Sequence, residues 1–183
     1  MKITILNGNM NSETEIFSVY LTNFSAELSK NHSVKHFQLK DMNIKQCLGC
    51  WNCWWKTPGK CTTKDDAGQI LESIINSDLV IFASPVTAGF TSSVLKKISD
   101  RMVSLLHPYI KIREKECHHR KRYDKYPNFG VLLMNDEDTD FEDTTIIMNI
   151  YERFALNFHS NIKFLFQIEQ NPIEDIIYEI NNI

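Results

Sequence analysis

Residues 47–61, CLGCWNCWWKTPGKC, hold four of the five cysteines of the chain and all three of its tryptophans. Cys47, Cys50 and Cys53 are separated by two residues each, and Cys61 follows a Pro-Gly pair. Four closely spaced thiolates are the ligand set of a [4Fe–4S] cluster, and they also suit tetrahedral Zn²⁺. The cysteine spacing alone does not decide between these two metals.

The same segment also has a reading without a metal. Cysteine packs as a small hydrophobic side chain, and Trp51, Trp54 and Trp55 would be costly to leave in water. Aromatic residues are enriched in the cores of protein interfaces. We therefore expect an interface and active-site loop that forms a homodimer or homotetramer through residues 51–55, with metal ligation as the alternative.

Composition limits the classes of protein to which the chain can belong. Its 183 residues are 43% hydrophobic and 23% charged, which predicts a single globular domain over residues 1–183. A net charge of -3 argues against nucleic-acid binding. The apolar run at residues 3–6 is too short for a secretory signal, and no run is long enough to span a membrane. We expect a cytoplasmic protein without a membrane segment.

Strand and helix patterns alternate along the chain. Expected strands cover residues 2–6, 34–39, 79–83, 129–134 and 162–168. Expected helices cover residues 12–30, 67–76, 92–106, 142–158 and 172–183. This order predicts a parallel sheet with helices on both faces, and residues 107–128 form an insertion at one end of it.

Ligands of open parallel sheets bind at the carboxyl ends of the strands. These ends are residues 8–14, residues 84–89 and Asn135-Asp136, and the cysteine segment, which follows the second strand, is expected at the same edge. Residues 8–14 run into a helix N-terminus, which favours a phosphate. A turn capped by Ser12 alone is the simpler alternative.

Four stretches together resemble the flavodoxin-like NAD(P)H-dependent FMN reductases, including their iron–sulfur flavoprotein relatives. The stretches are ILNGN, CLGCWNCWWKTPGKCTTKDD, DLVIFASPVTAGFTSSVLKKISDR and HPYI. The resemblance implies a flavodoxin-like three-layer α/β sandwich, with a five-stranded parallel sheet of order 2-1-3-4-5. It also implies noncovalent FMN, reduction by NAD(P)H, and oligomers with the flavin near a subunit boundary.

The resemblance assigns cofactor contacts to this sequence. The FMN phosphate would be held within residues 9–14, the flavin ring would lie along residues 84–89, and the loop at Asn135 would close its other side. The implied residues are Asn9, Asn11, Ser12, Thr14, Ser84, Pro85, Val86, Thr87, Ala88, Gly89 and Asn135. Two departures predict weaker FMN binding: residues 8–11 contain no arginine, and Thr87 stands where the family often has an aromatic residue.

These observations favour an FMN-dependent oxidoreductase. Hydride would pass from NAD(P)H to FMN, and electrons would go on to a quinone, a flavin or another small-molecule acceptor. Because the flavin carries the chemistry, no catalytic side chain is required. The alternative is an electron-transfer flavoprotein with FMN and a [4Fe–4S] cluster on Cys47, Cys50, Cys53 and Cys61. A binding module that keeps the fold without FMN is a third hypothesis.

Several charged residues have plainer expected roles. Residues 111–125 form a basic segment, which would either face water or meet the phosphates of a nicotinamide cofactor. Asp65 and Asp66 are expected to start a helix, where negative charge is favourable. Lys96, Asp100 and Arg101 are expected to serve helix packing and surface pairing.

Overall fold

Five parallel strands form the central sheet of the computed structural model, which describes residues 1–10 and 15–183. They are ordered β2-β1-β3-β7-β8. Their bounds are β1 Lys2–Asn7, β2 Ser33–Gln38, β3 Leu79–Thr87, β7 Asn128–Met134 and β8 Ile162–Gln167. Counting only these strands, the order is 2-1-3-4-5, so the expected flavodoxin-like sheet is confirmed.

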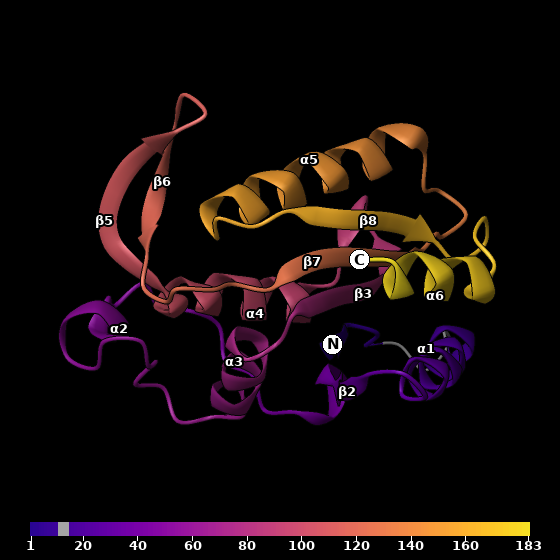
Figure 1. Ribbon diagram of the computed structural model, residues 1–183, viewed down its shortest axis with the longest axis horizontal. Coiled ribbons are helices and arrows are strands. Elements are labelled where there is room, and N and C mark those ends of the chain that lie inside the picture. The colour runs from indigo at the N-terminus through magenta and orange to yellow at the C-terminus, as the bar shows by residue number, and fades with distance from the viewer. Residues whose placement is uncertain (11–14) are drawn as a thin grey trace.

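Helices cover both faces of this sheet, because its strands carry apolar side chains on both sides. In β3, Val80 and Phe82 join one buried cluster, whereas Leu79, Ile81 and Ala83 join the other. The helices of the first face are α3 Ala67–Ile75, α4 Ser93–Arg101 and α5 Phe141–Asn157. The helices of the second face are α1 Glu15–Leu28 and α6 Ile173–Asn181. The three-layer sandwich is therefore confirmed (Figure 1).

The remaining short elements are two 3₁₀ turns, one short helix and one short strand. They are η1 Leu39–Asp41, α2 Asn52–Trp55, β4 Phe90–Thr91 and η2 Met102–Leu105. The helix expected over residues 92–106 thus ends at Arg101, and η2 completes it as a tighter turn. Within the described residues, no helix combines the length and the apolar character that a membrane span requires.

The segment expected as an insertion forms an antiparallel hairpin of β5 Leu106–Arg113 and β6 Glu116–Lys121. Arg113 donates from a guanidinium nitrogen to the Leu156 carbonyl at 3.3 Å, and the His119 amide donates to Asn157 Oδ1 at 3.0 Å. The hairpin is therefore attached to the C-terminal end of α5. It stands at the opposite end of the molecule from the arrowhead of β8 (Figure 1).

A tight turn ends β3 at the ligand-binding edge of the sheet. Thr87 pairs with Phe90, and the two residues between them have positive φ angles, 50° at Ala88 and 72° at Gly89. This is the conformation of a two-residue type I′ turn, which matches the twist of paired strands. A Cβ atom on Gly89 would lie 2.6 Å from Asp143 Oδ1, so the turn packs closely on the start of α5.

Gly89→Ala should destabilise the protein by about 1–2 kcal/mol or more, because a side chain is unfavourable at positive φ and would also meet Asp143. Ala88→Gly is the matched control, since it relieves the same strain one residue earlier. Urea denaturation followed by circular dichroism measures both changes. Equal stability of Gly89→Ala and the parent protein would show that the turn does not have this conformation.

Candidate functional site

A cavity lies at the carboxyl ends of β1, β3 and β7. Its volume is about 840 Å³, and we call it the strand-end cavity. Its walls are the loop after β1, the end of β3 with β4, the start of α4, and the loop after β7. They are lined by Gly8, Asn9, Met10, Pro85, Val86, Thr87, Phe90, Thr91, Ser92, Ser93, Lys96, Met134, Asn135 and Asp136.

Five of the predicted cofactor contacts line the strand-end cavity. They are Asn9, Pro85, Val86, Thr87 and Asn135. Parallel pairing of β1, β3 and β7 aligns the ends of these strands, which brings the five residues together although more than 120 positions separate the first from the last. Asn11, Ser12 and Thr14 lie outside the described residues.

Three other predicted cofactor contacts, Ser84, Ala88 and Gly89, do not line the strand-end cavity. The fully buried Ser84 uses its hydroxyl to accept from the Ser92 amide at 2.9 Å and to donate to the Pro85 carbonyl at 2.7 Å. Ala88 and Gly89 form the type I′ turn next to the cavity. These residues therefore fix the shape of the wall without forming its surface.

The strand-end cavity has polar atoms available for a ligand. Of the atoms that the structure describes, Ser92 Oγ and Asn135 Oδ1 are buried at this cavity without a hydrogen-bond partner. Burying such groups unpaired is unfavourable, which suggests that a ligand completes them. Gly8 permits a close approach here, since a Cβ would lie 2.6 Å from Ser92 Oγ. The wall fits the polar edge of a flavin or its phosphate.

Sequence reasoning missed two functional candidates in this wall. Phe90 supplies an aromatic side chain where Thr87 does not, because the tight turn folds β4 back beside the end of β3. Lys96 brings a positive charge to a cavity whose first loop has no arginine. Lys96 also forms an exposed ion pair with Asp100, as expected for surface pairing. Phe90 could have been found from the sequence because it directly follows the Ala88-Gly89 turn, which folds the chain back toward the end of β3.

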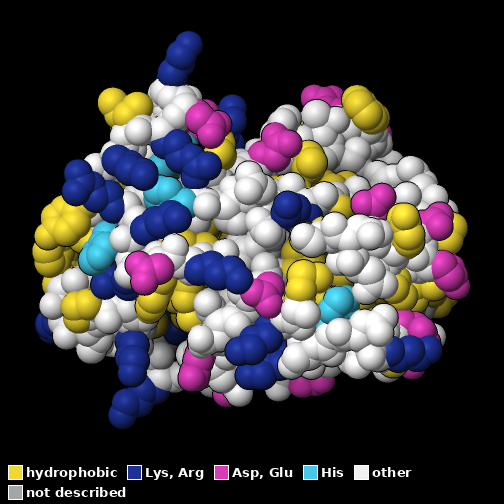
Figure 2. Space-filling view, viewed as in Figure 1, with side chains coloured by type: hydrophobic (Ala, Val, Ile, Leu, Met, Phe, Trp, Pro, Cys, Tyr) yellow, Lys and Arg dark blue, Asp and Glu magenta, His cyan; other side chains and the backbone are white. Residues whose placement is uncertain are grey.

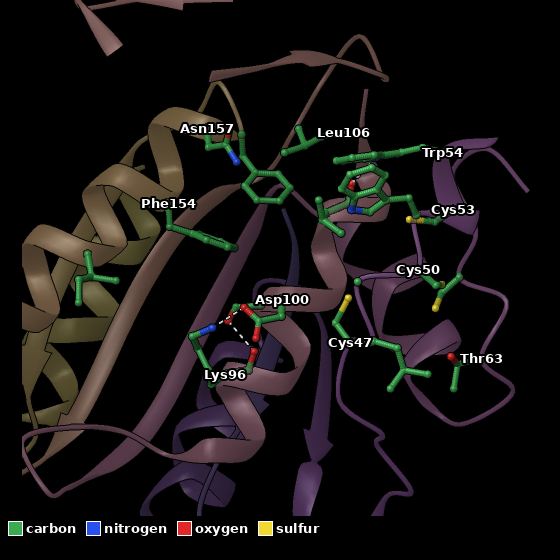
Figure 3. A pocket seen from close by; sticks show the side chains of 18 of the residues that line it. Cys47, Cys50, Cys53, Trp54, Thr63, Lys96, Asp100, Leu106, Phe154 and Asn157 are labelled. Carbon is green, nitrogen blue, oxygen red and sulfur yellow. Dashed lines mark hydrogen bonds and ion pairs between the residues drawn. The ribbon is translucent and has the colours of Figure 1, made fainter. Parts of the chain in front are cut away.

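A second cavity of about 590 Å³ adjoins the first. It lies between α4, α5 and residues 47–63, and we call it the cysteine-side cavity (Figure 3). Both cavities are lined by Phe90, Thr91 and Lys96, which form a partition between them. The far wall is apolar and aromatic, with Trp54, Leu106, Phe154 and Phe158.

The cysteine segment does not lie at the carboxyl edge of the sheet, so that expectation is wrong. Trp54 donates from Nε1 to the Val103 carbonyl at 3.2 Å, and its ring centroid is 5.2 Å from that of His119 on β6. Both contacts lie beyond the C-terminal end of α4, where the hairpin begins. The chain reaches this place before the cysteine segment begins, because the Lys45 carbonyl accepts a hydrogen bond from Arg101 at the last residue of α4.

A buried ion pair holds the two ends of the cysteine segment. Arg101 donates two hydrogen bonds to Asp65, at 2.7 and 3.0 Å, and a third to the Lys45 carbonyl at 2.9 Å. The Asp65 carboxylate also accepts from the Lys45 amide at 3.0 Å, and Asp66 accepts from the Asn43 amide at 2.7 Å. The side chains of Arg101 and Asp65 are 1% and 0% exposed.

This arrangement corrects two expectations. Arg101 does not pair at the surface, and Asp65 does more than start α3, although it accepts from the Ala67 amide at 3.2 Å. Burial acts to raise the pKa of Asp65. The hydrogen bonds from Arg101 and from Lys45 outweigh burial, so the pKa lies below its usual value.

The four thiols line the cysteine-side cavity together. Burial, followed by the neighbouring thiols of Cys61 and Cys47, raises the pKa of Cys53. Figure 3 shows the sulfur atoms of Cys47, Cys50 and Cys53 pointing in different directions. Among the described side chains, no three His, Cys, Asp or Glu are placed to hold a metal ion. In this arrangement the thiols do not form a ligand cage, so as placed they do not fit a metal ion or cluster.

Asp65→Asn should destabilise the protein by about 3–5 kcal/mol at pH 7, because it leaves the Arg101 charge buried without its partner. Since folding lowers the pKa of Asp65, this stabilisation is present above the unfolded value of about 3.9 and is lost as pH falls through the lower folded value. The difference between variant and parent should therefore shrink below pH 4.

Urea denaturation from pH 3 to pH 7 measures this difference, with Asp100→Asn as the control. Asp100 belongs to the exposed pair with Lys96, so its replacement should have little effect. If Asp65→Asn lowers the free energy of unfolding no more than Asp100→Asn does, the buried ion pair does not hold the cysteine segment in place.

Comparison with known proteins agrees with this geometry. The family model of the NADPH-dependent FMN reductases matches residues 1–121. An iron-sulfur flavoprotein of Archaeoglobus fulgidus is 31% identical over 102 residues, which are 55% of this chain and 48% of the relative. An iron-sulfur flavoprotein of Clostridioides difficile is 32% identical over 109 residues, 58% of this chain and 48% of that relative. The chain spans about half the length of these curated relatives.

The fold also matches solved structures. An azoreductase from Bacillus anthracis superposes with a TM-score of 0.63 and 15% sequence identity, over 100% of this chain and 96% of that one. At this identity the likeness concerns the fold alone. The family rests on the model that covers residues 1–121, which include the walls of the strand-end cavity up to Lys96. The chain therefore belongs to the NADPH-dependent FMN reductase family.

Proposed function

We propose that this protein is an FMN-dependent oxidoreductase that takes hydride from NAD(P)H and passes electrons to a small-molecule acceptor, such as a quinone or a flavin. The observation that carries the proposal is the strand-end cavity. Its lining has two buried, unpartnered oxygen atoms among the described residues, on Ser92 and Asn135, and it includes the aromatic side chain of Phe90. The family assignment supports FMN as the cofactor.

FMN, when bound, would accept a hydride and release electrons, so the chain has to bind, orient and shield it. Pro85, Val86 and Thr87 would lie along the ring, and Asn135 would face its polar edge. Asn9 and the predicted contacts at positions 11, 12 and 14 would hold the phosphate. The free N–H groups at the start of α4 and the Lys96 ammonium would add positive potential.

The cysteine-side cavity is suited to a flat, apolar acceptor. Trp54, Leu106, Phe154 and Phe158 form its apolar wall, and the partition of Phe90, Thr91 and Lys96 separates it from the strand-end cavity. An acceptor against this partition would lie next to the proposed FMN. The aromatic walls would exclude water from the space between the two ligands.

One observation favours a second candidate, an electron-transfer flavoprotein. The thiols of Cys47, Cys50, Cys53 and Cys61 line the cavity next to the proposed flavin site. Such a protein would accept electrons from another protein and carry them on its FMN. Turnover distinguishes the two candidates, because a carrier would not be reduced by NAD(P)H alone.

The exposed tryptophans support an oligomer. Trp51 and Trp55 are 61% and 65% exposed, although the hydrophobic effect favours their burial. We propose that residues 51–55 contact a second copy. Sedimentation velocity tests this proposal, because a dimer should weaken in Trp51→Ser and Trp55→Ser.

An anaerobic absorption spectrum of the purified protein, before and after addition of NADPH, tests the reductase. Flavin bands that bleach on NADPH addition are the expected result. An additional broad shoulder, with iron found by analysis, would mean that the four cysteines hold a cluster. A colourless protein that cannot take up added FMN would overturn both flavin-based candidates.

Thr87→Glu should weaken FMN binding at least about tenfold, because it places a carboxylate at the cavity wall, where a bound ligand would strip away its water. Thr22→Glu, which places a carboxylate at another exposed threonine but on α1, is the matched control. Titration of the apoprotein with FMN, followed by flavin fluorescence, measures both affinities. Equal affinities would place the FMN elsewhere.

A further inference from the structure

The N-terminal end of α5 is acidic, whereas the hairpin beside its C-terminal end is basic. Acidic residues gather in the loop before the helix and in its first turn: Asp136, Glu137, Asp138, Asp140, Glu142 and Asp143. Asp140 and Asp143 cap the helix, and Asp136 bonds to Thr139. Glu137, Asp138 and Glu142 are exposed. We call residues 136–143 the acidic loop.

The hairpin at the other end of α5 is basic. Paired residues lie on the same side of a ladder, so the side that bears Arg113 and Glu116 also bears Lys111, His118 and Arg120. Arg113 reaches the Leu156 carbonyl, and Glu116 pairs with Arg153 at 3.1 Å. This side therefore faces the end of α5. Figure 2 shows Lys and Arg side chains gathered in the region of the hairpin.

An apolar stripe joins the two charged ends. Glu142, Ile146, Ile150 and Arg153 are spaced by four, four and three residues, which places them on one face of α5. Ile146 and Ile150 are 44% and 47% exposed. Along this face the order is acidic, apolar, basic.

A face with this order of side chains is complementary to the same face of a second copy that runs in the opposite direction. When two α5 helices pack antiparallel about an axis midway between Ile146 and Ile150, each Ile146 faces the other copy's Ile150. Residues 136–140 then face residues 156–160, beside which the hairpin stands. The acidic loop of each copy then meets the basic hairpin of the other, so the same contact occurs twice. This is the geometry of a two-fold dimer.

We propose that this face of α5 binds a second copy of the chain in a two-fold dimer, in which the hairpin of one copy contacts the acidic loop of the other. Residues 51–55 lie at the hairpin end of the molecule, since Trp54 packs against His119. In a single copy the hairpin stands at the opposite end of α5 from the acidic loop (Figure 1). The dimer would bring it to the partner's cavity.

The consequence for function follows from Asp136, which belongs both to the acidic loop and to the wall of the strand-end cavity. The partner's hairpin would place Lys111 and Arg120 near the mouth of this cavity. We infer that they supply positive charge for the phosphates of the nicotinamide dinucleotide. This second step rests on the proposed function, whereas the dimer does not.

Charge reversal tests the dimer without any cofactor. Sedimentation velocity at about 20 µM, a concentration at which a specific interface is occupied, should show a parent dimer that weakens as salt screens the charges. The hairpin variant Lys111→Glu/Arg120→Glu and the loop variant Glu137→Lys/Asp138→Lys should each be monomeric. Their equimolar mixture should form dimers again, because both contacts then join opposite charges.

The control is Lys35→Glu/Lys40→Glu, an equal change of charge on exposed residues at the β2 edge of the sheet, which should leave the dimer intact. Restored dimers in the mixture also show that both variants are folded. A monomeric parent protein, dimeric single variants, or a mixture that stays monomeric would each overturn the proposal.

Binding of NADPH tests the contribution of the partner. The hairpin variant should bind NADPH at least about tenfold more weakly than the parent, as expected when two positive charges near phosphates are reversed, while its own strand-end cavity is unchanged. The mixture with the loop variant should recover this affinity at half of its sites. The hairpin-variant copy then receives a partner hairpin that carries Lys111 and Arg120, whereas the loop-variant copy receives glutamates. Unchanged affinity in a monomeric hairpin variant would overturn the inference about the dinucleotide and leave the dimer standing.

Discussion

The buried ion pair of Arg101 and Asp65 is the constraint on which the active-site side of this molecule depends. A guanidinium and a carboxylate are costly to remove from water, and here the cost is offset by two direct hydrogen bonds and by bonds to the backbone of Lys45. Because Lys45 and Asp65 bracket the cysteine segment, the pair closes a loop of some twenty residues against the end of α4. The wall of the cysteine-side cavity, the position of Trp54 and its contact with the hairpin all follow from that closure.

The parallel sheet supplies the other half of the arrangement. Pairing of β1, β3 and β7 brings three loops to one edge, and the turn at Ala88 and Gly89 folds β4 back beside β3. Helix α4 starts at this edge and ends at Arg101, which forms the buried ion pair with Asp65. A single helix therefore connects the strand-end cavity, through Lys96, with the place where the cysteine segment is fixed. The two cavities adjoin because they share this helix.

The sequence allowed the sheet and most helices to be predicted because their signals are local. The apolar run that begins at Leu79 and the alternation with helical segments determine a parallel sheet, and the sheet determines which loops meet. The position of the cysteine segment could not be predicted in this way. It depends on contacts from Lys45 to Arg101 and from Trp54 to Val103, which span about fifty residues and leave no periodic pattern. Ser84 was predicted as a contact because it belongs to a family stretch, but only its hydrogen bonds show that it supports the wall.

The partition between the cavities limits how such a protein can change during evolution. Phe90 and Thr91 contribute to both cavities, so a substitution at either position alters two binding surfaces at once. Of the two cavities, Leu48 and Thr63 line only the cysteine-side cavity. New ligand preferences can therefore arise on the outer wall by single, independent substitutions. The partition itself can change only when both surfaces tolerate the same residue, which makes the two residues of β4 the slowest part of the site to diverge.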